Sequence, residues 1–395
     1  MQTYDEKYIL SKAKEAFFSS ESPVFTVNGL FVFPGFCDVH VHFREPGFSY
    51  KETVRTGTGA AARGGYTAVC AMPNLSPVPD SPETLQLEQD IISRDAVIPV
   101  YPYAAITRGR KGSEITDFAS LKGAVAFSDD GSGVQSDEVM LRAMHLAARE
   151  NKLLAAHCEV EALLEGGCIH KGEYARGHGF KGISSESEYA MIERDIRLLE
   201  KTGCAYHVCH VSTAESIRLI REAKGRGLNI TCETAPHYLV LNDSMLKDEG
   251  CFKMNPPIRS EADRQALLEA VCDGTVDMIA TDHAPHSAEE KSKGLEGSAF
   301  GITGLETAFP VLYTKLVKEG IISLEKLIEL LAFNPRRRFK IPYDGSFTVW
   351  DLNEEYEIDP SKFKSKGKST PFLGLRVSGK CLGTYIGGKA VFRAE

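Results

Sequence analysis

The sequence lacks long apolar runs, because none of its hydrophobic stretches reaches the roughly 18 residues that a membrane-spanning helix needs. Its first residues also lack the apolar core of a signal peptide, so we expect a cytoplasmic protein without a membrane partner. No run of more than three basic residues occurs, and the net charge of -8 argues against nucleic acid as a partner. No CxxC pair occurs among the ten cysteines, which predicts small buried thiols in a reducing compartment.

From about residue 34 the sequence alternates short β-rich apolar runs with amphipathic helical stretches. Eight predicted strands, each but the last followed by a helical stretch, favour a (β/α)8 TIM-like barrel with its active site at the carboxyl ends of the strands. A doubly wound open sheet is the alternative, but the GxGxxG loop expected after its first strand is absent. The predicted strands lie in residues 35–42, 66–73, 96–105, 123–127, 152–158, 204–211, 229–237 and 276–284.

The two ends of the chain differ from the middle, because they contain short strands and turns with no helices between them. SPVFTVNGLFVF near the start and LRVSGKCLGTYIGGKAVF near the end are examples. We therefore expect residues 1–33 and 343–395 to pair into a small β-subdomain outside a catalytic barrel of residues 34–342.

Histidines and aspartates recur where the predicted strands end. His40 and His42 share one face of the first strand, with Cα atoms about 6.5 Å apart, although such a pair is equally typical of a packed strand. The fourth strand runs into Asp129 and Asp130, and the residues alone do not choose between them. Nitrogen and oxygen ligands in this number suit Zn²⁺ or a related ion and suggest two ions bridged by a carboxylate. The remaining strand ends with ligands carry His157, His210 and Asp282.

The motifs HVHFREPG, AMPN, ETAPHY, KMNPPIR and TDHAPH together resemble those of the amidohydrolase superfamily, in particular the bacterial dihydroorotases of the longer, type I class. The resemblance covers nearly the whole chain and implies the reversible interconversion of N-carbamoyl-L-aspartate and (S)-dihydroorotate in pyrimidine biosynthesis. It also implies zinc, with two ions bridged by Asp130 and a hydroxide. The ligands carried over by the resemblance are His40, His42, Asp130, His157, His210 and Asp282.

Two roles beyond metal binding follow from the same motifs. Asp282, as both a ligand and a carboxylate, is suited to carry a proton from the attacking water to the ring nitrogen, and the resemblance assigns it as general acid and base. Arg44 offers a planar fork of donors that suits a substrate carboxylate. The resemblance adds to substrate binding His42, Asn74, Asn255, His286 and the backbone of Phe300 and Gly301.

Each of these assignments has a simpler alternative in the sequence. Arg44 is also compatible with a surface salt bridge, Asn74 with a turn or cap, and His286 with an exposed loop. His283 faces away from Asp282 on a strand and is expected either to be structural or to contact the ligands from outside, while His237 could line the site but is not assigned as a ligand. The charged run in residues 289–293 is typical of a solvated loop, and its position after the last strand also suits a mobile lid.

Other functions fit parts of the pattern. A hydantoinase, dihydropyrimidinase or allantoinase would keep the fold, but related hydantoinases use a carboxylated lysine at the end of the fourth strand, and no lysine stands there. A catalytically silent scaffold for aspartate transcarbamoylase would have lost ligands, and none is lost. The resemblance implies a small-molecule substrate as the main partner. It is also compatible with a homodimer and with an association with aspartate transcarbamoylase. The motif reads Arg-Glu-Pro-Gly where Arg-Asp-Pro-Gly is common.

Overall fold

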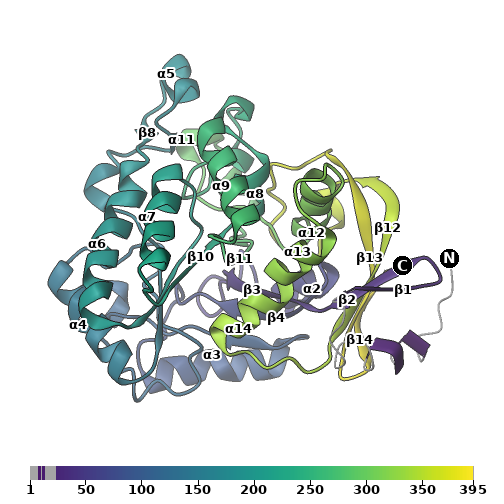
Figure 1. Cartoon of the computed structure of the whole chain (residues 1–395), viewed down its shortest axis with the longest axis horizontal. Coiled ribbons are helices and arrows are strands. Elements are labelled where there is room, and N and C mark those ends of the chain that lie inside the picture. Colours follow the sequence, from purple (N-terminus) through teal and green to yellow (C-terminus); the bar gives the residue numbers. More distant parts are fainter. Residues whose placement is uncertain (1–7, 10, 14–23, 395) are drawn as a thin grey trace.

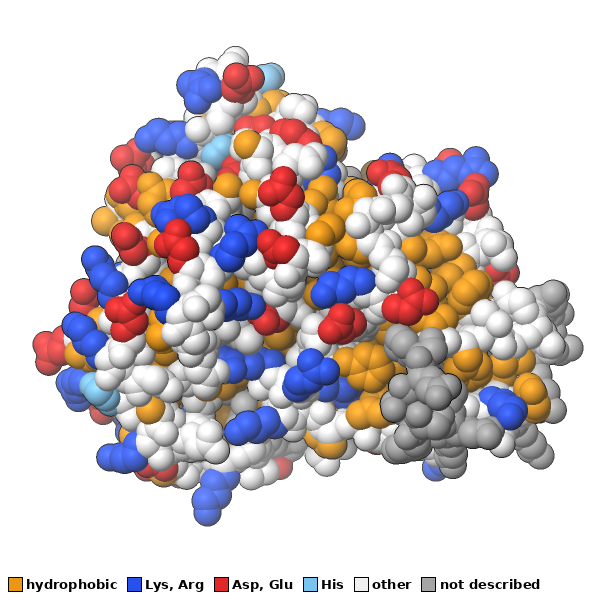
Figure 2. Space-filling model, in the orientation of Figure 1, with side chains coloured by type: hydrophobic (Ala, Val, Ile, Leu, Met, Phe, Trp, Pro, Cys, Tyr) orange, Lys and Arg blue, Asp and Glu red, His pale blue; other side chains and the backbone are white. Residues whose placement is uncertain are grey.

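The computed structural model describes residues 8–9, 11–13 and 24–394 of the chain. Figure 1 shows helices packed around parallel strands in one body, with a long antiparallel sheet along one side. No helix in the described ranges is long and apolar enough to span a bilayer. On the face drawn in Figure 2, Lys and Arg are interspersed with Asp and Glu over the helices, and hydrophobic side chains gather towards the sheet.

Two parallel sheets hold seven of the eight predicted barrel strands. One sheet has the order β3, β4, β5 and the other the order β11, β10, β9, β6. Their strands are buried along nearly their whole length, as expected for a parallel sheet covered by helices on its outer face. The bounds are β3 Phe36–Val41, β4 Tyr66–Ala71, β5 Val100–Pro102, β6 Leu153–Ala156, β9 Ala205–Val208, β10 Ile230–Thr234 and β11 Met278–Ile279.

Single β-bridges join these two sheets into a closed barrel. Phe127, in the predicted fourth strand, is bridged in parallel to Ala104 on one side and to Leu154 on the other. At the opposite seam, Val41 is bridged in parallel to His283, and the amide of His42 donates to the carbonyl of His283 at 2.8 Å. The eight predicted strands therefore follow one another around a ring, and the prediction of a (β/α)8 barrel is confirmed.

The expected helices cover the barrel, with one exception. The helix α2 (Val54–Arg63) begins at a capping box formed by Thr53 and Thr56 and ends at Gly64. Between β5 and the fourth strand, however, we expected a helical stretch and find only the 3-10 turn η1 (Arg108–Arg110), so that expectation is wrong. Glycines with positive φ at 109 and 112 break the helical path there. The other barrel helices are α3 Pro82–Asp95, α4 Asp137–Arg149, α6 Glu186–Thr202, α7 Ala214–Gly225 and α9 Glu261–Asp273.

The two ends of the chain meet in a five-stranded antiparallel sheet of order β1, β2, β12, β13, β14. β2 pairs with β12, so that Pro34 lies opposite Phe347 and the expected β-subdomain forms beside the barrel (Figure 1). Its exact borders after residues 33 and 342 stay a prediction. A cavity of about 950 Å³ lies against this sheet, and no predicted site residue lines it. The strands are β1 Phe25–Val27, β2 Leu30–Pro34, β12 Phe347–Glu357, β13 Arg376–Ile386 and β14 Lys389–Arg393.

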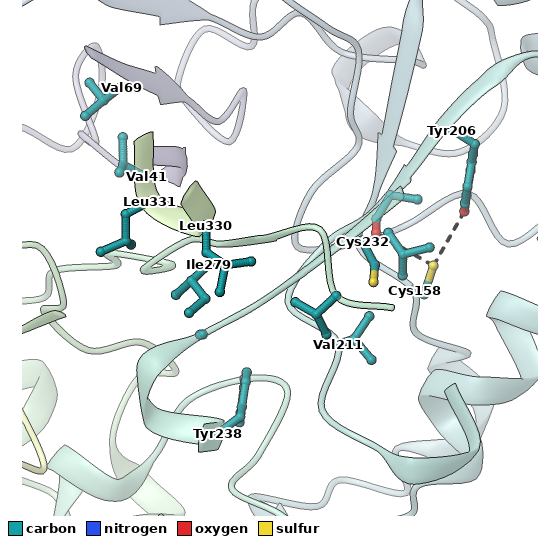
Figure 3. Close-up of a cluster of buried hydrophobic side chains, with 14 of the residues drawn as sticks. Val41, Val69, Cys158, Tyr206, Val211, Cys232, Tyr238, Ile279, Leu330 and Leu331 are labelled. Carbon is teal, nitrogen blue, oxygen red and sulfur yellow. Dashed lines mark hydrogen bonds between the residues drawn. The ribbon is translucent and has the colours of Figure 1, made fainter. Parts of the chain in front are cut away.

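Most cysteines pack as small apolar residues, as the sequence predicts. Eight of the ten are buried and all ten are free thiols, whereas Cys251 is half-buried and Cys272 is exposed, which corrects the prediction for those two. Figure 3 shows Cys158 and Cys232 within the hydrophobic core, where the Cys158 sulfur lies 3.5 Å from the Tyr206 hydroxyl.

An aromatic cluster joins the barrel to the antiparallel sheet. Phe36 of β3 lies 5.3 Å from Phe309 of α12 (Ala308–Leu312), measured between ring centroids. Phe309 in turn lies 4.2 Å from Trp350 of β12, and all three side chains are fully buried. Because large buried rings contribute heavily to core stability, this cluster fixes the sheet against the barrel.

We expect the substitution Phe309→Ala to lower the free energy of unfolding by about 3 to 5 kcal/mol, because it leaves a cavity between Phe36 and Trp350. Urea unfolding followed by tryptophan fluorescence measures the change. The matched control is Leu373→Ala, whose side chain is 69% exposed and whose loss should change stability by less than about 0.5 kcal/mol. Equal, small effects of the two substitutions would contradict the role of the cluster.

Candidate metal centre

Six predicted ligands lie at the carboxyl ends of five barrel strands. His40 lies in β3 and His42 directly follows it, and the other four follow the fourth, fifth, sixth and eighth strands of the barrel. All six side chains are buried, with no more than 7% exposure for any of them. Because the strands are parallel and close a ring, their carboxyl ends all open at one mouth.

The first group of ligand atoms comes from the seam where the barrel closes. The Nε2 atom of His42 lies 2.9 Å from Oδ1 of Asp282, and Nε2 of His40 lies 3.6 Å from the same oxygen. The bridge between Val41 and His283 places these neighbours side by side. His40, His42 and Asp282 thus offer three ligand atoms within 4.8 Å of one another.

The second group comes from the fifth and sixth strands of the barrel, β6 and β9. Nδ1 of His157 lies 2.9 Å from Nε2 of His210. His210 has a φ of 33° and Asp282 one of 48°, a left-handed conformation that is uncommon for residues other than glycine. Such backbone outliers cluster at functional sites, where they direct a side chain inwards.

The carboxylate of Asp130 lies between the two groups. Its Oδ1 atom is 3.4 Å from His40 Nε2 and 3.7 Å from both His157 Nδ1 and His210 Nε2. Its Oδ2 atom lies 3.6 Å from His42 Nε2. The neighbouring Asp129 turns away, because its carboxylate accepts hydrogen bonds from the amide and hydroxyl of Thr107.

The donor set fits a divalent cation. Nε2 of His40 and Oδ1 of Asp130 are buried and have no hydrogen-bond partner among the described residues. A buried polar atom without a partner is costly, so these two atoms call for a ligand. Imidazole nitrogens and carboxylate oxygens are donors that Zn²⁺ and related ions accept.

Two outer contacts fix the orientation of the histidines. Nδ1 of His40 lies 2.7 Å from Oε1 of Glu233, and Nδ1 of His42 lies 2.8 Å from Oδ1 of Asn74. When each Nδ1 donates a proton outwards, the lone pair of Nε2 faces the site, as metal-binding histidines require. The sequence analysis missed Glu233, although a carboxylate inside the apolar β10 was a usable signal. Glu233 also accepts from the buried His207 at 3.1 Å.

The buried charges shift one another's protonation. Burial alone would lower the pKa of His40, but the negative charges of Glu233 and Asp130 raise that pKa well above its usual value. Burial alone would raise the pKa of Asp130, but the positive charge of His40 and the close approach of His210 hold it well below its usual range. Against its burial, the pKa of Asp282 falls to about 2, chiefly through the hydrogen bond from His42. The carboxylates are thus ionised at neutral pH.

A second cluster beside the ligands contains most of the predicted substrate residues. The Nη2 atom of Arg44 lies 3.3 Å from His286 Nε2, which donates to the carbonyl of Phe300 at 2.7 Å. Lys51 Nζ lies 3.2 Å from the other ring nitrogen of His286. Burial and the charges of Arg44 and Lys51 lower the pKa of His286 to about 3, so this histidine is neutral. The amide of Gly301 already donates to Lys253 at 3.1 Å.

Asn255 connects to the metal ligands through a residue that the sequence analysis missed. Its Nδ2 atom donates to Oε1 of Glu159 at 2.8 Å, while Oε2 of Glu159 lies 3.4 Å from Nε2 of His157. Burial alone would raise the pKa of Glu159, but the hydrogen bond from His157 and that residue's positive charge lower it. The position of Glu159 two residues after His157 was the available signal.

Three further predictions concern residues around the last strand and β10. His283 is structural, because its Nδ1 accepts from the amide of Gly304 at 3.2 Å and its ring lies beside Glu52. His237 is fully buried in the helix α8 (Pro236–Val240), and its Nε2 has no partner in the described part of the chain. The charged run 289–293 is not simply a solvated loop, because Lys291 is buried and donates to two backbone carbonyls.

Comparisons with known proteins point to one family. A family model described as "Dihydro-orotase-like" matches residues 29–216. The dihydroorotases of Bacillus cereus (strain AH820) and Bacillus thuringiensis (strain Al Hakam) are each 50% identical to the chain over 98% of its length and 92% of theirs. Among solved structures, the L-hydantoinase (dihydropyrimidinase) of Arthrobacter aurescens has a TM-score of 0.83 at 25% identity, covering 92% of this chain and 86% of its own. A dihydropyrimidinase from Brevibacillus agri has a TM-score of 0.80 at 21% identity, covering 92% and 85%, which shows the shared fold.

We expect Glu233→Gln to weaken metal binding about 10- to 100-fold, because His40 loses the carboxylate that orients its ring. Competition with a chromophoric chelator measures the affinity of the metal-free protein. Glu289→Gln is the matched control, since the side chain of Glu289 is 86% exposed. Unchanged affinity in the Glu233 variant, with an unchanged unfolding midpoint, would contradict this role.

His237 generates a prediction for pH. Burial lowers its pKa to about 4, whereas the unfolded chain should keep a value near 6.5. Unfolding therefore takes up a proton in this window, so the contribution of His237 to stability is complete above pH 6.5 and is lost as the pH falls through 4. We expect His237→Gln to reduce the loss of stability between pH 7 and pH 4 by roughly 3 kcal/mol. Urea unfolding at both pH values tests this, with the exposed His145→Gln as the control that should leave the loss unchanged.

Proposed function

The chain belongs to the dihydroorotase family, and we propose that the ligand atoms gathered around Asp130 are the centre of its active site. The protein is a hydrolase of cyclic amides, a dihydroorotase that interconverts N-carbamoyl-L-aspartate and (S)-dihydroorotate in de novo pyrimidine biosynthesis. One observation carries the assignment of the site: a single carboxylate faces imidazoles from three other strands at the barrel mouth.

We further propose that the site holds two zinc ions per subunit. His40, His42 and Asp282 would hold one ion and His157 and His210 the other, with Asp130 shared between them. An ion of this kind lowers the pKa of water towards about 7 and polarises an amide carbonyl. The partnerless Nε2 of His40 and Oδ1 of Asp130 support this proposal, because both atoms are aimed where a cation would satisfy them.

Asp282 is proposed to move the proton. Its Oδ1 atom lies beside Nε2 of His42 and His40, where it would help to hold an ion, and Oδ2 would accept a proton from water and deliver it to the ring nitrogen. Its low pKa of about 2 means that this carboxylate is ionised at neutral pH. In the biosynthetic direction the same oxygen would take a proton from the carbamoyl nitrogen as the ring closes.

The second cluster is proposed to bind the substrate. Arg44 would bring a positive charge to the substrate, while the neutral His286 would contribute a polar, uncharged wall of the binding site. Asn74 uses its oxygen for His42, so its Nδ2 is the atom that would donate to the substrate. Asn255 is held by Glu159, and its Oδ1 is a buried acceptor with no partner among the described residues. Phe300 and Gly301 are proposed to line the ring, although their backbone groups already bond His286 and Lys253.

We expect Asp282→Ala to abolish turnover in both directions, because no other carboxylate in the proposed site has an oxygen assigned to this proton transfer. The assays are cyclisation of carbamoyl aspartate, hydrolysis of dihydroorotate, and zinc content by mass spectrometry. Asp90→Ala, an exposed residue of α3, is the control and should keep full activity. Full activity of the Asp282 variant would refute its role.

The same assays separate the remaining alternatives. Hydrolysis of hydantoin, dihydrouracil or allantoin without conversion of dihydroorotate would favour a different cyclic amide as substrate. Assays with and without aspartate transcarbamoylase test the proposed association, and sedimentation tests the proposed homodimer. A metal-free protein that stays inactive in every setting would support the silent scaffold and reject an active zinc enzyme.

A further inference from the structure

Arg110 lies at the barrel mouth in the one connection that lacks a helix. It is the last residue of η1, the turn that joins β5 to the fourth strand. Its Nη1 atom donates to the backbone carbonyl of Asp130. The same Nη1 atom and Nδ2 of Asn74 lie 3.6 and 3.7 Å from the point where a Cβ on Gly131 would stand, so the two donors flank one backbone position. A cationic donor thus stands next to a proposed substrate donor.

The charge of Arg110 has no ion-pair partner among the described residues, although Asp129 and Asp130 lie near enough to favour it electrostatically. No carboxylate of the described residues pairs with its guanidinium within 4.0 Å, and its Nε is buried without a hydrogen-bond partner in the same part of the chain. Its carbonyl contact uses one of five N–H donors. By comparison, the buried Arg194 pairs with Asp195 at 2.7 Å. A partly buried cation without an anion is costly, so the environment of Arg110 favours an anionic ligand.

Arg44, like Arg110, has no ion-pair partner among the described residues, and the two arginines lie near each other. It also lacks a carboxylate within 4.0 Å in the described ranges, and it lies close enough to Arg110 for the two positive charges to repel each other. Both arginines adopt the left-handed backbone conformation, with φ of 62° for Arg44 and 55° for Arg110. Residues held in this conformation cluster at ligand-binding sites. An anion between the two guanidinium groups would relieve their repulsion.

We propose that Arg110 is a substrate-binding residue that, together with Arg44 and Asn74, contacts the carboxylate that carbamoyl aspartate and dihydroorotate both retain. This inference rests on the proposed function, because it names the part of that substrate which the residue recognises. Arg110 acts on the substrate directly and not through Asp130 alone. It therefore contributes to selectivity for carboxylated rings, which a planar guanidinium fork recognises well.

The test compares a ligand that carries the carboxylate with one that lacks it. Competitive inhibition constants are measured for orotate and for uracil, which is orotate without its carboxylate, on the zinc-loaded enzyme. We expect Arg110→Met to weaken the binding of orotate at least about tenfold, which is the size of a lost charged hydrogen bond. The inhibition constant of uracil should stay within about twofold of the wild-type value. The orotate inhibition constant of Arg110→Lys should lie between those of the wild type and Arg110→Met, since lysine keeps the positive charge but lacks the planar fork of donors. In the Arg110 variants, KM for dihydroorotate should rise in parallel with the inhibition constant of orotate. The value of kcat should change less than KM.

Arg108→Met is the matched control, because Arg108 lies in the same turn with its side chain 52% exposed and paired with Glu114. It should leave both inhibition constants unchanged. Equal losses for orotate and uracil, or lower zinc content in the Arg110 variants, would mean that Arg110 acts by positioning Asp130 and would overturn the proposal. Unchanged orotate binding would overturn it as well. If the wild type fails to convert dihydroorotate, the proposed function fails, while calorimetry with orotate still decides the role of Arg110.

Discussion

The site depends on the compensation of buried negative charge. Asp130, Asp282 and Glu233 carry their carboxylates inside the barrel mouth, and each is ionised only because imidazoles surround it. Without those partners, burial would favour the protonated acids. The contact with His40 that helps to keep Glu233 charged also turns Nε2 of His40 inwards, while the amide oxygen of Asn74 does the same for His42.

That arrangement is possible because the barrel closes. His40 and His42 come from the first strand and Asp282 from the last, and they meet only through the bridge between Val41 and His283. The antiparallel sheet built from the two ends of the chain packs on the outside of this region through Phe36, which belongs to the same strand as His40. The strand that carries His40 is therefore also held by the aromatic cluster.

Positive charge is distributed around the outside of this centre. Arg44 and Arg110 both face the mouth without carboxylate partners in the described chain, whereas His286 is neutral despite its cationic neighbours. A dianionic substrate such as carbamoyl aspartate complements such a rim, because it supplies the missing counter-ions. The missing helix between β5 and the fourth strand brings Arg110 to this position, since a short turn with glycines replaces an outer helix there.

Sequence alone determined the eight-strand alternation, the two-ended β-subdomain and the residues at the strand ends, because these follow from periodicity and chain order. It could not choose between Asp129 and Asp130 from the residues, since the fourth strand ends irregularly and either side chain could turn inwards. The tertiary structure separates them: Thr107 bonds Asp129, and the histidines face Asp130. The contacts with the site that suggest a role are likewise visible only in the tertiary structure for Glu233, Glu159 and Arg110. Local pattern fixes which face a residue occupies, but only closure of the barrel decides which faces meet.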